Sequence, residues 1–108
     1  MTEEDTIAFR INLSQKGYVS VYVLHDGTSD KIISDGYFPK GEHDLDAGYQ
    51  LKGNRGKNVL ALTFSSSALN MEETAKQKLI VESVRNGVSS LTIGDTFITL
   101  TYETIEIR

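Results

Sequence analysis

The sequence predicts a mostly β fold: an antiparallel β-sandwich, or an open barrel, of about seven strands with one helix near residues 71–85. Short stretches in which apolar and polar residues alternate are separated by turns rich in Gly and Asp, which is typical of such folds. Only the segment 71–85 has the composition and end signals of a helix. With 108 residues, the chain is expected to be a single domain, 1–108.

The first predicted strand covers residues 7–13. Ile7, Phe9, Ile11 and Leu13 share one face, with polar residues and Ala8 between them. This period of two indicates a strand with one buried face. A short turn at 15–17 then predicts an antiparallel hairpin with the strand that follows.

The second predicted strand, 17–24, is apolar on both faces. Val19, Val21 and Val23 point one way, and Tyr22 and Leu24 point the other. The segment 59–64 is nearly continuous in apolar residues, as expected for a central strand covered on both sides. The predicted core includes Ile11, Val21, Leu62 and Leu100.

The middle of the chain is predicted to be mostly loop. Asp26-Gly27 is a turn signal, residues 31–34 form a short strand at best, and 35–48 is interpreted as a loop that holds the only proline, Pro39. A short strand is expected near 49–52, followed by a basic turn at 53–58.

The segment 71–85 is predicted to be a helix capped by Asn70, with Glu73 completing a capping box and Asn86-Gly87 ending it. Its inner stripe is expected to contain Met71, Ala75 and Leu79, widened by Ile80 and Val84. Glu72 and Lys76 are spaced as an i,i+4 ion pair. The alternative makes 79–84 a strand with a hairpin turn at Asn86-Gly87.

Two strands, 88–94 and 96–107, are predicted to close the chain around Gly94-Asp95. In the last one, Ile98 and Leu100 have even numbers whereas Ile105 and Ile107 have odd numbers. This change of phase predicts a β-bulge near Glu103-Thr104.

Composition bears on the class of partner. The formal net charge of −4 disfavours nucleic acid and anionic membranes as partners, because binding to phosphate depends on clustered Lys and Arg. No segment is long enough for membrane insertion, and the acidic start does not match a signal peptide. The absence of cysteine excludes thiol chemistry and leaves the compartment undetermined, so the chain could also belong to a longer exported protein.

The acidic stretch 25–46 is the one candidate metal site. Carboxylates from turning loops are the ligands that calcium prefers. The candidate ligands are Asp26, Asp30, Glu42, Asp44 and Asp46. Their spacing matches neither an EF-hand nor a zinc motif, so no cofactor is predicted, and the competing interpretation is a solvated connection whose Asp residues serve turns.

Other candidate sites have weaker patterns. Ser65–Ser67 and the two histidines, His25 and His43, match no catalytic motif. The basic turn near Arg55 has the composition to bind a phosphate or an acidic partner, yet it lacks a Walker sequence. A stacking surface is conceivable for the five tyrosines Tyr18, Tyr22, Tyr37, Tyr49 and Tyr102.

The segment Gly17–Ser66 resembles a bacterial accessory domain family of unknown function, found appended to caspase-like peptidases, protein kinases and envelope lipoproteins. The resemblance is carried, in order, by "GYVSVYV", "DG", "YFP", "AGYQL" and "GKNVLAL". It covers about half of the chain. It departs from the family pattern after Pro39, where Lys40-Gly41-Glu42 stands in place of an Asn-rich loop, and the C-terminal part of the chain carries no signature of the family. It implies an accessory β-sandwich module and no catalytic residues.

The sequence therefore favours a non-enzymatic accessory module that binds another protein or another domain of its parent chain, with no nucleic acid and no membrane insertion. The first alternative is a β-sandwich that binds calcium or a small ligand through residues 25–46. The second is an enzyme whose site assembles only in space.

Overall fold

The computed structural model describes residues 2–108, without the side chains at positions 46, 47 and 49. The described residues confirm a mostly β fold with seven strands and one helix. In chain order the elements are β1 (Thr6–Leu13), β2 (Gly17–His25), β3 (Thr28–Phe38), β4 (Gly41–Gln50), β5 (Gly56–Ser65), α1 (Glu73–Arg85), β6 (Ser90–Ile93) and β7 (Thr96–Ile107).

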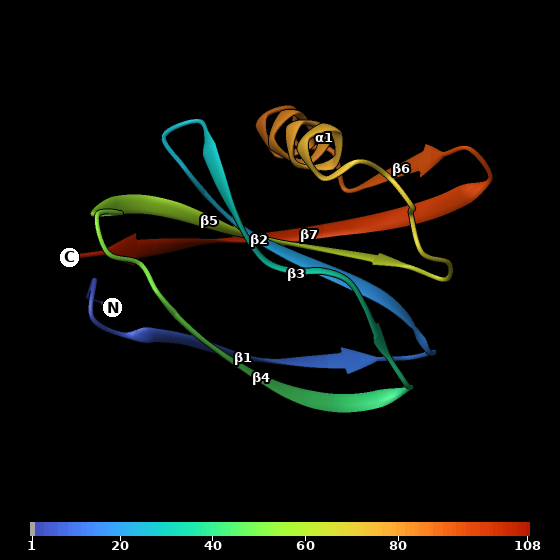
Figure 1. The fold of residues 1–108 in the computed structure, drawn as a ribbon, viewed down its shortest axis with the longest axis horizontal. Helices are drawn as coiled ribbons and strands as arrows, with labels where there is room; N and C mark the ends of the chain where they lie inside the picture. The colour runs from blue at the N-terminus through green and yellow to red at the C-terminus, as the bar shows by residue number, and fades with distance from the viewer. Residues whose placement is uncertain (1) are drawn as a thin grey trace.

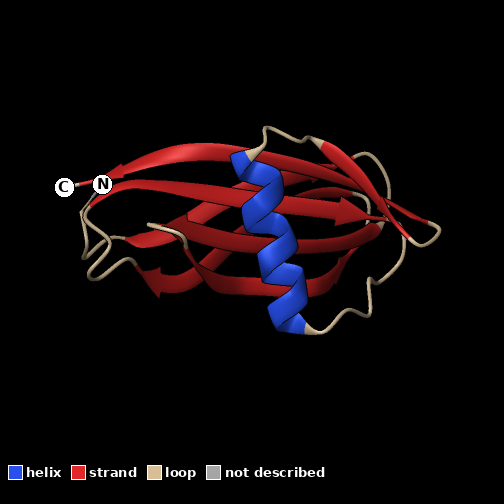
Figure 2. Ribbon diagram, turned by 90° about the horizontal axis from the view of Figure 1, so that it is seen from above, coloured by secondary structure: helices blue, strands red, loops and turns tan. Residues whose placement is uncertain are grey.

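The strands form two antiparallel sheets. The larger sheet has the order β3-β2-β5-β7-β6, and the smaller one pairs β1 with β4. The smaller sheet packs against one face of the larger sheet, and α1 lies across the other face (Figures 1 and 2). The described strands close into no barrel, so the arrangement is sandwich-like with a helix on its outer side.

The two apolar faces of β2 are explained by these two covers. Val19, Val21 and Val23 face the smaller sheet and pack in clusters with Ile7 and Ile11. Tyr22 and Leu24 face the helix and pack with Ile80. The prediction that residues 59–64 form a central strand is also confirmed, because β5 lies in the middle of the larger sheet. Its cover is incomplete, since the side chains toward the smaller sheet are only half-buried.

The predicted hairpin between the first two strands is wrong. β1 pairs with β4, in a register that places Phe9 opposite Leu45 and Ile11 opposite His43. Residues 14–16 instead carry the chain from one sheet to the other. The alternation in β1 correctly predicted its buried face, but side-chain period says nothing about which strand supplies the main-chain partners.

The interpretation of residues 35–48 as a loop is also wrong, because most of them belong to β3 and β4. Both strands are edges of their sheets, where polar side chains and glycine are tolerated. Two register shifts in β2–β3 give β3 extra residues, and Asp35 within them has a positive φ of 49°. These are β-bulges, and they direct Ser34 and Asp35 toward the helix.

No bulge occurs near Glu103-Thr104. β7 pairs with β5 without a shift from Ile107 to Ile98. The apolar residues switch faces because different elements cover the two ends of β7. Ile98 and Leu100 lie under α1, whereas Ile105 and Ile107 lie over the smaller sheet on the opposite face of the same regular strand.

The predicted helix is confirmed over Glu73–Arg85, and the strand alternative is wrong. Its N-cap is Glu72, whose side chain accepts a hydrogen bond from the Thr74 amide, rather than Asn70. Asn86 is the C-cap, and Gly87 follows with a φ of 68°. The inner stripe is displaced from the predicted one, because the buried residues are Lys76, Ile80 and Ser83.

Gly17 is required for packing at the start of β2. A Cβ atom there would overlap the ring of Phe64 and lie 2.7 Å from the carbonyl oxygen of Ser65. We expect Gly17→Ala to lower the free energy of unfolding by about 1–3 kcal/mol, although alanine normally suits a strand better than glycine. Urea denaturation measures this change. In the Gly17→Ala protein, the added substitution Phe64→Leu should recover part of the lost stability. A Gly17→Ala protein more stable than the parent would contradict the close packing at Gly17.

Candidate functional site

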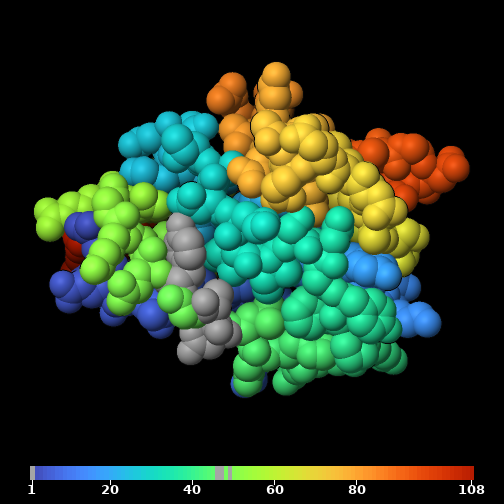
Figure 3. Space-filling view, viewed as in Figure 1, coloured from blue at the N-terminus to red at the C-terminus, as the bar shows by residue number. Residues whose placement is uncertain are grey.

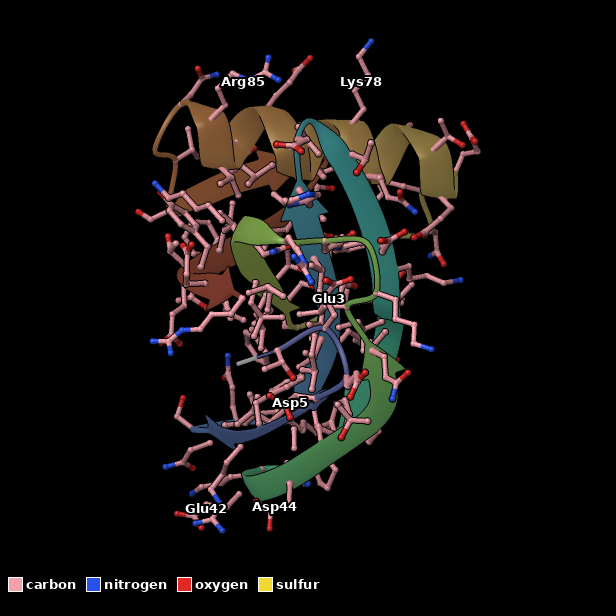
Figure 4. The ribbon with its side chains drawn as sticks, turned by 90° about the vertical axis from the view of Figure 1, so that its left-hand side faces the viewer. Glu3, Asp5, Glu42, Asp44, Lys78 and Arg85 are labelled. Atoms are coloured by element: carbon pink, nitrogen blue, oxygen red, sulfur yellow. The ribbon has the colours of Figure 1, made fainter. Side chains whose placement is uncertain are left out.

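Two of the candidate metal ligands lie in or near the β2–β3 turn. Asp26 has a φ of 49°, and its Oδ2 lies 3.2 Å from Nε2 of His25. Asp30 lies on β3. Glu42 and Asp44 are exposed on β4, where Arg10 pairs with both (Figure 4). The guanidinium of Arg10 holds the pKa of Asp44 below its usual range.

The β2–β3 turn rises beside the helix, while β4 lies on the far side of the sandwich (Figure 1). The structure therefore places the predicted ligands in two separate regions. Among residues with described side chains, no group of three acidic or histidine side chains is arranged to hold a metal ion. The side chain of Asp46 lies outside the described part, and the calcium site stays a prediction.

The basic turn 52–57 already holds a carboxylate from its own chain. Arg55 pairs with Glu3, and the Gly53 amide donates to Glu3 Oε2 at 2.8 Å. The Gly53 amide, together with Arg55, lowers the pKa of Glu3. Figure 4 shows Glu3 beside this turn. By composition this turn is suited to bind an external phosphate or acidic partner, and in the structure a carboxylate of the chain itself lies there.

The serines and histidines are not brought together. Ser65 donates to the Ser67 carbonyl at 2.8 Å, His25 contacts the Lys57 carbonyl at 3.1 Å, and His43 contacts the Pro39 carbonyl at 2.7 Å. The tyrosines are also divided: Tyr18 and Tyr37 form an edge-on pair, and Tyr22 is buried under α1. The side chain of Tyr49 lies outside the described part.

A polar network that the sequence analysis missed lies between α1 and the larger sheet. Lys76 is 1% exposed, and its Nζ donates to Ser20 Oγ at 2.6 Å and to Ser34 Oγ at 3.0 Å. The same nitrogen lies 3.3 Å from Asp35 Oδ1 and 5.9 Å from the centre of the Tyr22 ring. The bulge in β3 supplies two of these partners, so the ammonium is fully ligated by the sheet.

Glu73 extends this network along the helix. It accepts hydrogen bonds from the Tyr22 hydroxyl and the Ser34 hydroxyl, both at 2.9 Å, and from Gln77 at 3.2 Å. Burial alone would raise its pKa, but these hydrogen bonds and the charge of Lys76 outweigh burial, so the pKa of Glu73 is lowered. Burial also raises the pKa of Tyr22.

Ser20 and Lys76 together have the composition of a serine–lysine catalytic pair. Their geometry supports another role. Ser20 is 1% exposed, and its Oγ accepts hydrogen bonds from Lys76 Nζ at 2.6 Å and from the Asp35 amide at 2.9 Å. A substrate carbonyl has no access to that oxygen. The network instead fixes the helix on the sheet in one register. None of its buried side-chain nitrogen or oxygen atoms lacks a hydrogen-bond partner.

The lowered pKa of Glu73 predicts a pH effect. The folded state favours the ionised form, so this contribution to stability is complete above the ordinary pKa of 4.5 and is lost as the pH falls through the folded value. We expect the Tm of the parent protein to fall more than the Tm of Glu73→Gln when the pH is lowered from about 5 to about 3. Thermal melts at each pH test this, with Glu82→Gln on the exposed helix face as the control. Equal slopes for parent and Glu73→Gln would contradict it.

The second candidate region is an uncovered part of the larger sheet. On the face toward the smaller sheet, β7 is buried at Ile107 and half-buried at Ile105, but exposed from Glu103 to Phe97, which is 59% exposed. The neighbouring strand β5 leaves three large apolar side chains only half-buried there. We call this surface the open face; it consists of Leu60, Leu62, Phe64, Phe97, Thr99, Thr101 and Glu103.

The open face exists because the smaller sheet has only two strands. Leu45 of β4 packs against the same cluster as Ile33 and Phe38 of β3, and Ile7 of β1 shares a cluster with Val23 of β2. The β5 side chains of the open face touch these clusters as well, but keep part of their surface exposed. β4 and β1 thus cover the β3–β2 side of the larger sheet and the end of β7 at Ile105 and Ile107, and no described strand covers β6 or residues 97–103 of β7 on this face. A groove of about 240 Å³ runs there between Phe9, Ile11, Leu60, Leu62 and Thr101.

One edge of β1 borders this groove. β1 pairs with β4 alone, so every second residue of β1 directs its N–H and C=O groups away from β4, toward the open face. The β6–β7 hairpin projects past the rest of the molecule at one end (Figure 3). An unpaired strand edge and an uncovered apolar sheet face therefore meet at one place.

Comparison with protein-family models, curated proteins and solved structures found no match for this chain. The resemblance of Gly17–Ser66 to a bacterial accessory family stays a prediction. Among the described residues, no helix has the length and apolar character needed to span a membrane.

Proposed function

We propose that this chain is a non-enzymatic interaction module that binds a separate protein on the open face. The observation that carries the proposal is the half-buried state of Leu60, Leu62 and Phe64, which belong to the central strand of the larger sheet. A central strand normally buries such residues, and contiguous exposed apolar surface marks sites of association.

The chemistry of the surface supports a polypeptide partner. The open face combines three large aliphatic or aromatic side chains from β5 with Phe97 and two threonines from β7. A net charge of −4 opposes binding to nucleic acid through phosphates. Ser20 and Lys76, a pair with catalytic composition, are buried and satisfied, which supports a binding role over a catalytic one.

Site-specific cross-linking in the native cell tests the proposal. A photoreactive phenylalanine derivative at Thr101 should cross-link to a separate protein, and the same group at Thr104 should not, because Thr104 is exposed on the opposite face of β7. The captured protein, once purified, should bind the domain again, and Thr101→Lys should weaken that binding by at least about tenfold.

Equal capture from Thr101 and Thr104, or rebinding that Thr101→Lys leaves unchanged, would contradict the proposal. A cross-link formed within one longer parent chain would assign the open face to a contact between domains and would overturn the separate partner.

A further inference from the structure

We infer that the partner contributes an extended strand that pairs with the free edge of β1 and becomes the third strand of the smaller sheet. This inference rests on the proposed function and specifies the ligand as a polypeptide segment in β conformation. Its position would be fixed by main-chain hydrogen bonds to β1 and by side chains inserted against the open face.

The geometry of the sandwich leads to this occupant. Neighbouring strands of a sheet lie about 4.8 Å apart, and packed sheets lie about 10 Å apart. Because β1 lies below β2 and β5, the next position in the smaller sheet lies below β5 and β7. A strand in that position would satisfy the edge of β1 and cover Leu62 and Thr101 together.

The side chains on the open face specify the pattern of the partner strand. Successive residues of a strand point to opposite faces, so every second residue would contact Leu60, Leu62 or Phe64, and these should be apolar. β1 has eight residues, which sets the length of the paired segment. The bound strand would thereby continue the existing core between the two sheets.

Charge adds a second specificity. Glu103 is exposed on the open face, and no basic side chain in the described part of the chain forms an ion pair with it. A lysine or arginine in the partner strand would meet this carboxylate. The ligand is therefore an alternating segment whose inward-facing residues are apolar, apart from a basic residue opposite Glu103.

A second copy of the chain fits the β1 edge poorly. Two β1 strands paired antiparallel about a two-fold axis would place both larger sheets on the same side of the joined smaller sheet. Each larger sheet extends past β1 through β7 and β6, so the two extensions would occupy the same space. A single strand avoids this collision.

A synthetic peptide tests the inference. The probe is a ten-residue peptide, blocked at both ends, with Val or Ile at alternate positions, Lys in place of the first and the last of these, and Thr at the positions between them. Two further versions are N-methylated at the odd or at the even positions. A strand that pairs by one edge directs only alternate N–H groups to its partner, so one set of methyl groups blocks pairing and the other points away.

We expect the unmodified peptide and one methylated version to bind, and the other version to lose affinity by at least about tenfold, because several main-chain hydrogen bonds disappear. NMR amide signals of β1 should shift and gain protection on binding. Glu103→Lys should weaken binding, and Glu106→Lys, on the opposite face of β7, should leave it unchanged.

Three results would overturn strand addition: no binding at about 1 mM peptide, binding that maps to another strand edge, or self-association of the domain that protects β1 without peptide. Equal binding of both methylated versions, still weakened by Glu103→Lys, would also overturn it and would leave the open face as the binding surface. Cross-linking at Thr101 decides the proposed function separately, because it requires no strand pairing.

Discussion

Replacing Lys76 with alanine should lower the free energy of unfolding by about 3 kcal/mol, at the lower end of the range for breaking a buried ion pair. Lys76 is 1% exposed, and its removal leaves Asp35, Ser20 and Ser34 without their shared donor. The loss is limited because the Asp35 side chain keeps 26% exposure and can take up water.

Chemical denaturation measures this change. Lys78→Ala, two residues along on the solvent side of the helix (Figure 4), is the matched control and should change stability by less than about 0.5 kcal/mol. The double variant Lys76→Met with Asp35→Asn should recover part of the loss, because it removes both charges and keeps most of the volume. Equal effects of Lys76→Ala and Lys78→Ala would show that the network does not hold the helix.

Val21→Asp should abolish folding. Val21 is 0% exposed and lies on the face of β2 that packs against Ile11 of β1. Burying an unpaired carboxylate there costs several kcal/mol, comparable with the ~5–15 kcal/mol that stabilises a domain. Circular dichroism and the dispersion of the NMR spectrum report the outcome.

Thr92→Asp provides the control for Val21→Asp, because Thr92 is an exposed residue of a strand in the same sheet. It should fold as the parent does. If Val21→Asp also melts like the parent, the position of β2 between the two covers is wrong.

Periodicity in the sequence was sufficient to predict the buried faces. Ile11, Val21 and Leu100 are buried as predicted, and β5 is central as predicted. Leu62 is only half-buried, and this difference is informative. An apolar pattern indicates which face of a strand is covered, but the extent of the cover depends on how many strands the opposite sheet has.

The pattern of apolar and polar residues could not predict which strands pair or which polar side chains meet. Residues 35–48 looked like a loop because edge strands with bulges tolerate Asp and Gly, so their composition resembles that of turns. Lys76 was predicted only as an i,i+4 partner of Glu72, because helical spacing cannot reveal a hydroxyl cluster on a distant bulge. The open face has no local signature, since it arises from the number of strands in the smaller sheet.

β1 has one edge paired with β4 and one free edge that borders the open face. Amide hydrogen exchange of the isolated domain, followed residue by residue by NMR, tests it most directly. We expect slow and fast exchange at alternate residues of β1, and slow exchange throughout the middle of β5, which is paired on both sides. Slow exchange at every residue of β1 in a monomer would contradict the free edge.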